Sequence, residues 1–363
     1  MHPDFQRLMQ DATRLVRDGD LTAATAAIQA ALNGSPAMPP PPMPTAPGDI
    51  VVDVEARELP SPPQQREPVD GPGVAPSSSA EGAFISGRCG DGRAQRAYKL
   101  YVPPQPDARP LPLIVMLHGC SQDPDDFAAG TRMNEAARRH GCFVLYPAQS
   151  QQANPQRCWN WFKHSHQQRG RGEPALLAAM TQYVMARHNI DPARVYVAGL
   201  SAGGAMAAIL GDAYPDLYAA AGVHSGLASG AAKDLPSALA AMRSGGVAAG
   251  GGLRGVPTIV FHGDADGTVH PDNGHHVIRA SAGSVDDEPQ AHRHQTAAGR
   301  SYTRRVHRSP QGEVLAEHWV VHGSGHAWSG GSQRGSYTDP TGPDATEEML
   351  RFFLEHPLNG PVS

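Results

Sequence analysis

The chain has 363 residues with 30 basic and 35 acidic side chains, so its formal net charge is −5. This balance gives no reason to expect a nucleic-acid partner or an anionic membrane surface. No run of residues approaches the ~20 apolar positions of a membrane-spanning helix, and we expect no transmembrane segment. The N-terminus shows no apolar signal-peptide core, so we expect a cytoplasmic protein, with secretion by another route left open.

Residues 1–32 are predicted to form a helical hairpin with one apolar face, because apolar positions recur at helical spacing on both sides of Asp18-Gly19-Asp20. The hairpin is too short to hold a core alone. Docking on the domain that follows is the simplest outcome, and self-association or attachment to a granule through residues 4–32 are alternatives. Residues 33–82 are rich in proline and are predicted to be a disordered linker.

Strand and helix patterns alternate over residues 83–363, which we predict to be one folded domain. Such alternation is typical of the α/β class, with a mostly parallel sheet covered by helices on both faces. The predicted strands are 97–102, 113–117, 143–146, 195–198, 258–261 and 318–321. The predicted helices are 125–140, 173–188, 202–214 and 344–355.

A candidate nucleophile lies in the segment 199–203, Gly-Leu-Ser-Ala-Gly, which fits G-x-S-x-G directly after a predicted strand and before an Ala-rich helix. In an α/β-hydrolase fold this sharp turn exposes the serine, here Ser201, and tolerates only very small neighbours. Negative charge that develops on the ester oxygen needs two backbone N–H donors. We assign these to Ala202 and to Cys120, in the loop after the strand 113–117.

The acid and the base should follow the serine in the order Asp/Glu, then His. Asp266 comes after a buried strand and three residues before Val269, so we predict it to be the acid. Asp264 is the second candidate and could instead cap the turn. His326, in a Gly-rich loop after the strand 318–321, is the predicted base. The histidines and cysteines match no zinc spacing, so we expect neither metal nor organic cofactor.

Five segments together are more specific than the serine motif alone: LHGCSQ, CWNWF, GLSAGGAM, HGDADGTV and GSGHAWSGG. Over roughly residues 84–355 the chain resembles the poly(3-hydroxybutyrate) depolymerase family of esterases, which is related to feruloyl and acetylxylan esterases of the first carbohydrate-esterase family. The resemblance implies Ser201, Asp266 and His326 as a triad and an ester or polyester as substrate.

The expected reaction is ester hydrolysis through an acyl-enzyme. Short 3-hydroxyalkanoate esters are the preferred substrates, and feruloyl or acetylated sugar esters are the alternatives. From another class, the chain could be a hydrolase-like binding protein that is tethered by its N-terminal helices.

Three tryptophans and two cysteines complete the predicted site. Trp159 or Trp161 could contact substrate, with core packing as the alternative for one of them, and Trp328 lies two residues past the base. Cys120 and Cys158 lie in segments that should converge near the site. A disulfide between them would fix the oxyanion loop, although a reducing cytoplasm would oppose it.

Overall fold

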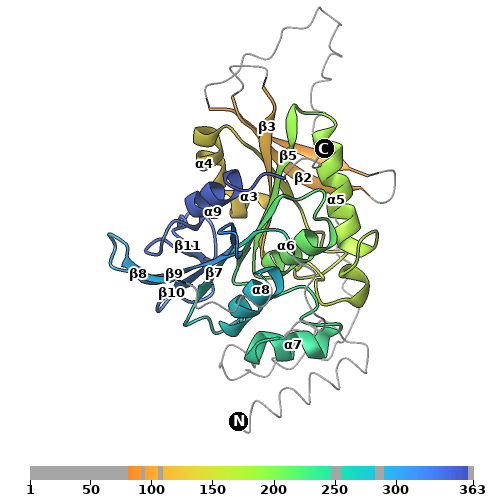
Figure 1. Cartoon of the computed structure of the whole chain (residues 1–363). Helices are drawn as coiled ribbons and strands as arrows, with labels where there is room; N and C mark the ends of the chain where they lie inside the picture. The colour runs from red at the N-terminus through yellow and green to blue at the C-terminus, as the bar shows by residue number, and fades with distance from the viewer. Residues whose placement is uncertain (1–80, 91–94, 105–108, 247–254, 283–289, 359–363) are drawn as a thin grey trace, which may run out of the picture. The chain divides into compact units, whose positions relative to one another are not determined.

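The computed structural model describes residues 81–90, 95–104, 109–246, 255–282 and 290–358. The predicted helical hairpin and nearly all of the predicted linker therefore lie outside the described residues. The described part is built around a ten-stranded sheet with the strand order β1-β2-β4-β3-β5-β6-β7-β10-β9-β8 (Figure 1).

The strands of this sheet are β1 (Ala83–Cys89), β2 (Arg96–Val102), β3 (Leu111–Leu117), β4 (Phe143–Pro147), β5 (Ile190–Leu200), β6 (Ala220–His224), β7 (Thr258–Gly263), β8 (Gln290–Gln295), β9 (Ser301–Arg308) and β10 (Val314–Val321). A short pair, β11 (Trp328–Ser329) and β12 (Thr338–Asp339), lies apart from it. The helices are α3 (Pro124–Thr131), α4 (Met133–His140), α5 (Gly172–Met185), α6 (Ala202–Ala213), α7 (Leu235–Ser244), α8 (Asp272–Ala282) and α9 (Ala345–Leu354), with a 3-10 turn η2 (His164–His166).

The middle of the sheet is parallel: β4, β3, β5, β6, β7 and β10 pair in parallel with each successive neighbour. The flanking strands β1, β2, β9 and β8 pair antiparallel. Every residue of β3, β4, β6 and β7 is buried, because helices cover both faces of these strands. The predicted α/β architecture is confirmed.

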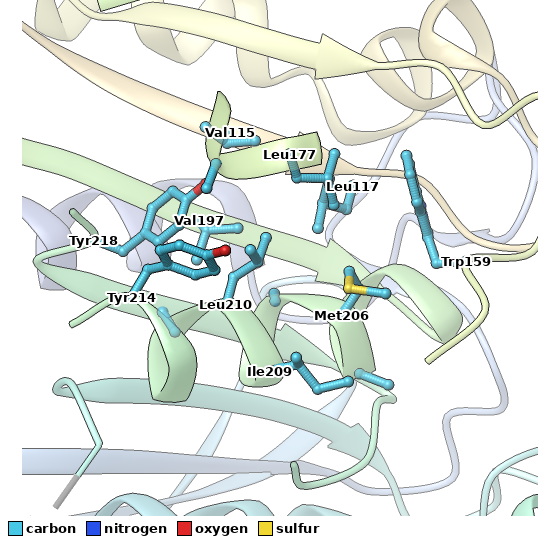
Figure 2. Packing of buried hydrophobic residues seen from close by; sticks show 14 of the residues in the cluster. Val115, Leu117, Trp159, Leu177, Val197, Met206, Ile209, Leu210, Tyr214 and Tyr218 are labelled. Carbon is cyan, nitrogen blue, oxygen red and sulfur yellow. The ribbon is translucent and has the colours of Figure 1, made fainter. Parts of the chain in front are cut away.

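Alternate residues of the central strands point into different helix layers. One face packs against α5, α6 and α8, and the other against α3, α4 and α9. Figure 2 shows part of the first layer, in which sheet residues lie against apolar side chains of α5 and α6: Val115, Leu117 and Val197 against Leu177, Met206, Ile209 and Leu210. This continuous core holds the strand ends that carry the site.

The single helix predicted over 125–140 is wrong, because the structure divides it into α3 and α4. Arg132 separates them in the left-handed conformation, with φ 56°. Its guanidinium Nη2 donates to Gly330 O at 2.9 Å and to Asp344 Oδ2 at 2.8 Å. The break thus directs the Arg132 side chain toward the C-terminal loops. In a continuous helix this side chain would point elsewhere.

A buried carboxylate on β10 joins β9 to α9. The Glu317 side chain is 1% exposed, and it accepts hydrogen bonds from Arg304 Nη2 at 2.6 Å and Arg351 Nη2 at 2.7 Å. Burial alone would raise the pKa of Glu317, but the hydrogen bond from Arg304 and the charge of Arg351 hold that pKa below its ordinary value. The carboxylate therefore stabilises the fold in its charged form.

We predict that Glu317→Ala lowers the free energy of unfolding at pH 7 by about 3 kcal/mol, because two guanidinium groups lose a buried partner. Urea denaturation measures this. The stabilisation is present above the carboxyl's unfolded pKa, about 4.3, and is lost as pH falls through the lower folded pKa, so the two proteins should converge in acid. Glu348→Ala, which removes a half-exposed partner of Arg351, should cost less than about 1 kcal/mol. Equal losses of stability in Glu317→Ala and Glu348→Ala would contradict the stabilising role of the buried Glu317 carboxylate.

Candidate active site

The serine turn joins β5 to α6. Ser201 has φ 58° and ψ −119°, a conformation that is strained for any residue but glycine. A Cβ atom on Gly203 would overlap Leu117 O, and one on Gly199 would overlap the backbone of Gly203. These glycines let the turn pack directly on the end of β3. The N–H of Ser201 donates to His224 O at 2.9 Å, which fixes the turn from β6 as well.

The predicted acid and base are in direct contact. Asp266 Oδ2 accepts a hydrogen bond from His326 Nδ1 at 2.7 Å. The other oxygen, Oδ1, accepts from the N–H groups of Thr268 at 2.8 Å and Val269 at 2.9 Å. Because Nδ1 donates to the carboxylate, Nε2 is the ring nitrogen left to accept a proton.

The Asp266 side chain has no solvent-exposed surface. Burial alone would raise its pKa, but hydrogen bonds from His262, His326 and the Val269 N–H together hold the pKa of Asp266 well below its ordinary value. The carboxylate is therefore charged at neutral pH. It can orient the imidazole and stabilise the imidazolium that forms when Nε2 takes a proton.

The second aspartate candidate belongs to another pair. Asp264 Oδ2 lies 2.8 Å from His322 Nδ1, and Asp264 Oδ1 accepts from the N–H of Gly323. This aspartate is 41% exposed, in contrast to the fully buried Asp266. The structure thus pairs Asp266, and not Asp264, with His326. Asp264 and His322 tie the loop after β7 to the loop after β10.

Ser201 lies beside the loop of residues 118–122 that follows β3, since a Cβ on Gly119 would lie 3.7 Å from Ser201 Cβ. Ser201 and His326 are both described, but no hydrogen bond joins Ser201 Oγ to His326 in this structure. Catalytic hydrogen bonds are often long without substrate and shorten when it binds. The proton transfer between these two residues stays a prediction.

The loop of residues 118–122, here called the oxyanion loop, is held on several sides. His118 O accepts from Trp159 Nε1 at 3.0 Å, and the Ser121 N–H donates to Gln156 O at 2.7 Å. A disulfide joins Cys120 to Cys158. Among the described residues, no acceptor binds the N–H of Cys120 or of Ala202. These are the two groups predicted to hold the oxyanion.

A buried polar network that the sequence did not reveal supports this loop. The Glu173 carboxylate accepts from Gln149 Nε2 at 2.6 Å and from Asn160 Nδ2 at 2.7 Å. The Gln149 N–H in turn donates to His118 Nε2 at 3.2 Å. Burial lowers the pKa of His118 to about 4, so its ring is neutral and can accept this bond. These polar residues follow no spacing that a sequence pattern could have detected.

The predicted substrate-contacting tryptophans need correction, because all three are buried: Trp159 is 1% exposed, Trp161 5% and Trp328 1%. Trp159 packs in the core near Met206 (Figure 2). The Trp328 ring stacks on His224, and its Nε1 donates to Thr346 Oγ1 at 3.0 Å. In this structure the three rings support the loops of the site and do not line an open surface.

Tyr337 is a further residue near the base, and the sequence analysis did not single it out. Its side chain is 47% exposed, and its ring centroid lies 6.5 Å from that of His326. It lies in a Gly- and Ser-rich loop, where no spacing marks it.

In the described ranges, no group of His, Cys, Asp or Glu side chains could hold a metal ion. No helix of the described part has the length and apolar character needed to cross a bilayer.

The sheet, the strand-to-helix serine turn and the Asp–His pair define the α/β-hydrolase fold, and solved structures agree. The chain is similar to the acetyl xylan esterase from Aspergillus awamori, with a TM-score of 0.58 and 18% identity over 75% of this chain and 99% of that one. It is also similar to an S-formylglutathione hydrolase from Agrobacterium tumefaciens, with a TM-score of 0.51 and 12% identity over 77% of this chain and 97% of that one.

The particular family follows from sequence comparison. Residues 96–281 match the family described as "Esterase PHB depolymerase", and the chain belongs to this family. It is 33% identical over 230 residues to poly(3-hydroxyalkanoate) depolymerase C of Paucimonas lemoignei, covering 59% of this chain and 54% of that protein. It is 35% identical over 150 residues to feruloyl esterase B of Thermothelomyces thermophilus, covering 41% and 50%. The chain thus spans about half the length of the curated relatives it matches.

We predict that protein isolated without reductant has two reactive thiols when denatured, Cys89 and Cys142, and four after reduction. Replacing both Cys120 and Cys158 by serine should lower the free energy of unfolding by about 3–4 kcal/mol, the entropy estimate for a bridge that spans 38 residues. Thiol titration and urea denaturation measure these effects. Cys89→Ser is the control and should change stability little. Four thiols in the unreduced protein would contradict the bridge.

Proposed function

We propose that the chain is a serine esterase with Ser201 as nucleophile, His326 as base and Asp266 as the orienting acid. The observation that carries the proposal is the buried carboxylate–imidazole pair, at the same edge of the sheet as a serine held in a strained strand-to-helix turn. Membership of an esterase family supports the same reading. The strained backbone of Ser201, with φ 58° and ψ −119°, is in keeping with a functional role.

The reaction proceeds by two acyl transfers. His326 Nε2 removes the proton of Ser201 as its oxygen attacks the ester carbonyl. The N–H groups of Cys120 and Ala202 donate to the oxyanion, and these donors carry no competing acceptor among the described residues. The imidazolium returns its proton to the departing alcohol, which leaves an acyl-serine. Water, deprotonated by His326, then releases the acid and restores the serine.

Short 3-hydroxyalkanoate esters, or oligomers of the polyester, are the substrates we propose. The similarity to the poly(3-hydroxyalkanoate) depolymerase extends over 230 residues, against 150 for the feruloyl esterase. The higher identity of the shorter match, 35% against 33%, makes feruloyl esters the second candidate. Acetylated sugars are the third, because acetylxylan esterases also match, with 25% identity over 226 residues in one case.

We predict that Ser201→Ala and Asp266→Asn lower kcat for 4-nitrophenyl butyrate by about 10³-fold or more, because the first removes the nucleophile and the second weakens the orientation of His326. Asp264→Asn is the matched control. It removes the same charge at a position two residues before Asp266, where the carboxylate pairs with His322, and it should keep activity within about threefold. Steady-state kinetics measure all three. Comparable losses in the two aspartate variants would contradict the choice of Asp266.

A fluorophosphonate probe distinguishes the esterase from a hydrolase-like binding protein. We expect the wild-type protein to be labelled at Ser201 and Ser201→Ala to remain unlabelled. Peptide mass spectrometry locates the adduct. Unchanged melting temperature in the variant would show that its fold is intact. Absence of labelling in the wild-type protein would favour the binding protein and overturn the proposed mechanism.

We predict that kcat/KM is higher for the methyl ester of a 3-hydroxybutyrate dimer than for methyl ferulate or acetylated xylan. Parallel assays that titrate released acid measure the three rates under one set of conditions. Faster cleavage of methyl ferulate would place the chain with the feruloyl esterases and would leave the triad assignment untouched. The Ser201→Ala protein supplies the background rate for each substrate.

A further inference from the structure

A large side chain is exposed beside the base. In the described part of the chain, the large apolar or aromatic residues with substantial exposure are Ile85, Leu235 and Tyr337. Ile85 lies on the edge strand β1 and Leu235 begins α7. Tyr337 instead lies next to His326, and the two rings are nearly perpendicular, at 80°. An aromatic ring exposed beside a catalytic imidazole is positioned to contact whatever enters the site.

The backbone at Tyr337 is strained. Its φ is 52°, in the left-handed region that costs a non-glycine residue roughly 1–2 kcal/mol. Ser121 of the oxyanion loop, with φ 63°, and the nucleophile Ser201, with φ 58°, share this region. Such strain gathers at functional sites, because the surrounding structure holds residues where the chemistry needs them. Tyr337 lies beside two segments of the proposed site, the oxyanion loop at Ser121 and the loop that carries His326.

The loop that carries Tyr337 is fixed on both sides by its backbone. Tyr337 O accepts from the N–H of Trp328 at 2.7 Å. The preceding Ser336 donates its N–H to Asp126 Oδ1 at 2.8 Å, and its carbonyl accepts from Gln122 Nε2 at 3.2 Å. These bonds fix the backbone from which the tyrosine ring projects, and the ring itself remains open to solvent.

The phenol oxygen faces the oxyanion loop. Tyr337 OH lies 3.3 Å from Ser121 Oγ, and Ser121 Oγ already donates to Cys120 O at 2.6 Å. The tyrosine hydroxyl is therefore the donor in its long contact with the serine, and it can turn to a better acceptor. A substrate carbonyl close to the oxyanion loop would supply one.

The ring lies beside the imidazole that gives its proton to the alcohol in the proposed mechanism. In the proposed mechanism His326 gives its proton to the leaving oxygen, so the alcohol part of the ester must lie beside the imidazole. Tyr337 lies beside the same imidazole, with its hydroxyl toward the loop after Cys120. The hydroxyl therefore borders both the imidazole, beside which the alcohol lies in the proposed mechanism, and the loop that is predicted to hold the oxyanion.

We propose that Tyr337 is a specificity-determining residue that binds the alcohol part of the substrate, and that its hydroxyl donates a hydrogen bond to a carbonyl carried by that alcohol. The substrate class is then an ester whose alcohol is itself a hydroxy-acid ester, as in an oligomer of hydroxy acids. This inference rests on the proposed esterase function, and it concerns which alcohol the site prefers and leaves the chemistry of bond cleavage unchanged.

The test uses two butyrate esters of secondary alcohols. Methyl 3-butanoyloxybutanoate carries the second carbonyl, and 2-pentyl butyrate lacks it. We expect the wild-type protein to prefer the first ester, and Tyr337→Phe to lower kcat/KM for it about three- to tenfold, the range of one neutral hydrogen bond. The rate for 2-pentyl butyrate should stay within twofold. Chromatography of the released butyrate measures both rates and distinguishes this cleavage from hydrolysis of the methyl ester.

Tyr183→Phe is the matched control, because it removes a phenol oxygen from a partly exposed tyrosine of α5 that packs on Arg187 and Tyr98. It should change neither rate. Equal losses on both esters in Tyr337→Phe, no loss on either, or a wild-type protein without preference would overturn the role of Tyr337. Hydrolysis that persists in Ser201→Ala, or a wild-type protein inactive on both esters, would instead overturn the esterase proposal itself.

A stability measurement separates binding from a structural role. Glycine adopts the left-handed conformation without strain, and the exposed ring contributes little burial. Tyr337→Gly should therefore keep the melting temperature within about 2 °C of the wild-type value or raise it, while it removes the preference for the carbonyl-bearing alcohol. A melting temperature lowered by 5 °C or more would show that the ring holds the loop, and would count against a binding role.

Discussion

The close contact between the serine turn and the end of β3 is the constraint on which the rest of the site depends. Leu117 and Gly199 are register partners in the parallel pair β3–β5. Gly203, one turn farther, packs against Leu117 O without room for a Cβ atom. The two strands therefore end at the same level. This places the oxyanion loop after β3 beside the nucleophile after β5, before any side-chain interaction is considered.

Burial keeps two histidines close to the site in their neutral form. Burial lowers the pKa of His224 to about 3 and that of His118 to about 4, so both rings are neutral at pH 7. His224 lies behind the serine turn, stacked between Phe261 and Trp328. A second cation there would repel the imidazolium of His326.

Local pattern was enough to predict the parts of the site that lie at strand ends. The turn at Ser201, the acid after β7 and the base after β10 each follow a buried strand, and the hydrophobic periodicity of those strands is visible in the sequence. The break at Arg132 was missed because it depends on contacts with Gly330 and Asp344, about 200 residues away. The tryptophans were misplaced for the same reason, since spacing does not reveal which face of a loop is covered.

The sequence pattern was too weak to predict some strands of the sheet. The edge hairpin β8–β9 carries charged and histidine residues in place of an apolar alternation, because much of it faces solvent. Strand β6, Ala-Ala-Gly-Val-His, is short and most of its side chains are small, so its own sequence does not mark it as a strand. Its burial follows only from its neighbours β5 and β7. Tyr337 shows the limit most clearly: its relation to His326 and Ser121 exists only after a loop is folded onto α3.

In the functions proposed above, chemistry and substrate choice come from different parts of this fold. The proposed nucleophile, acid and base stand at the ends of β5, β7 and β10, and a shift in any of these strands would disturb the central sheet. Tyr337 stands on a loop that is bound to α3 through Asp126 and to β11 through Trp328. A change in that loop can alter the alcohol side of the site without moving the triad. This separation is our proposed reason why proteins named as depolymerase, feruloyl esterase and acetylxylan esterase can all be similar to one chain.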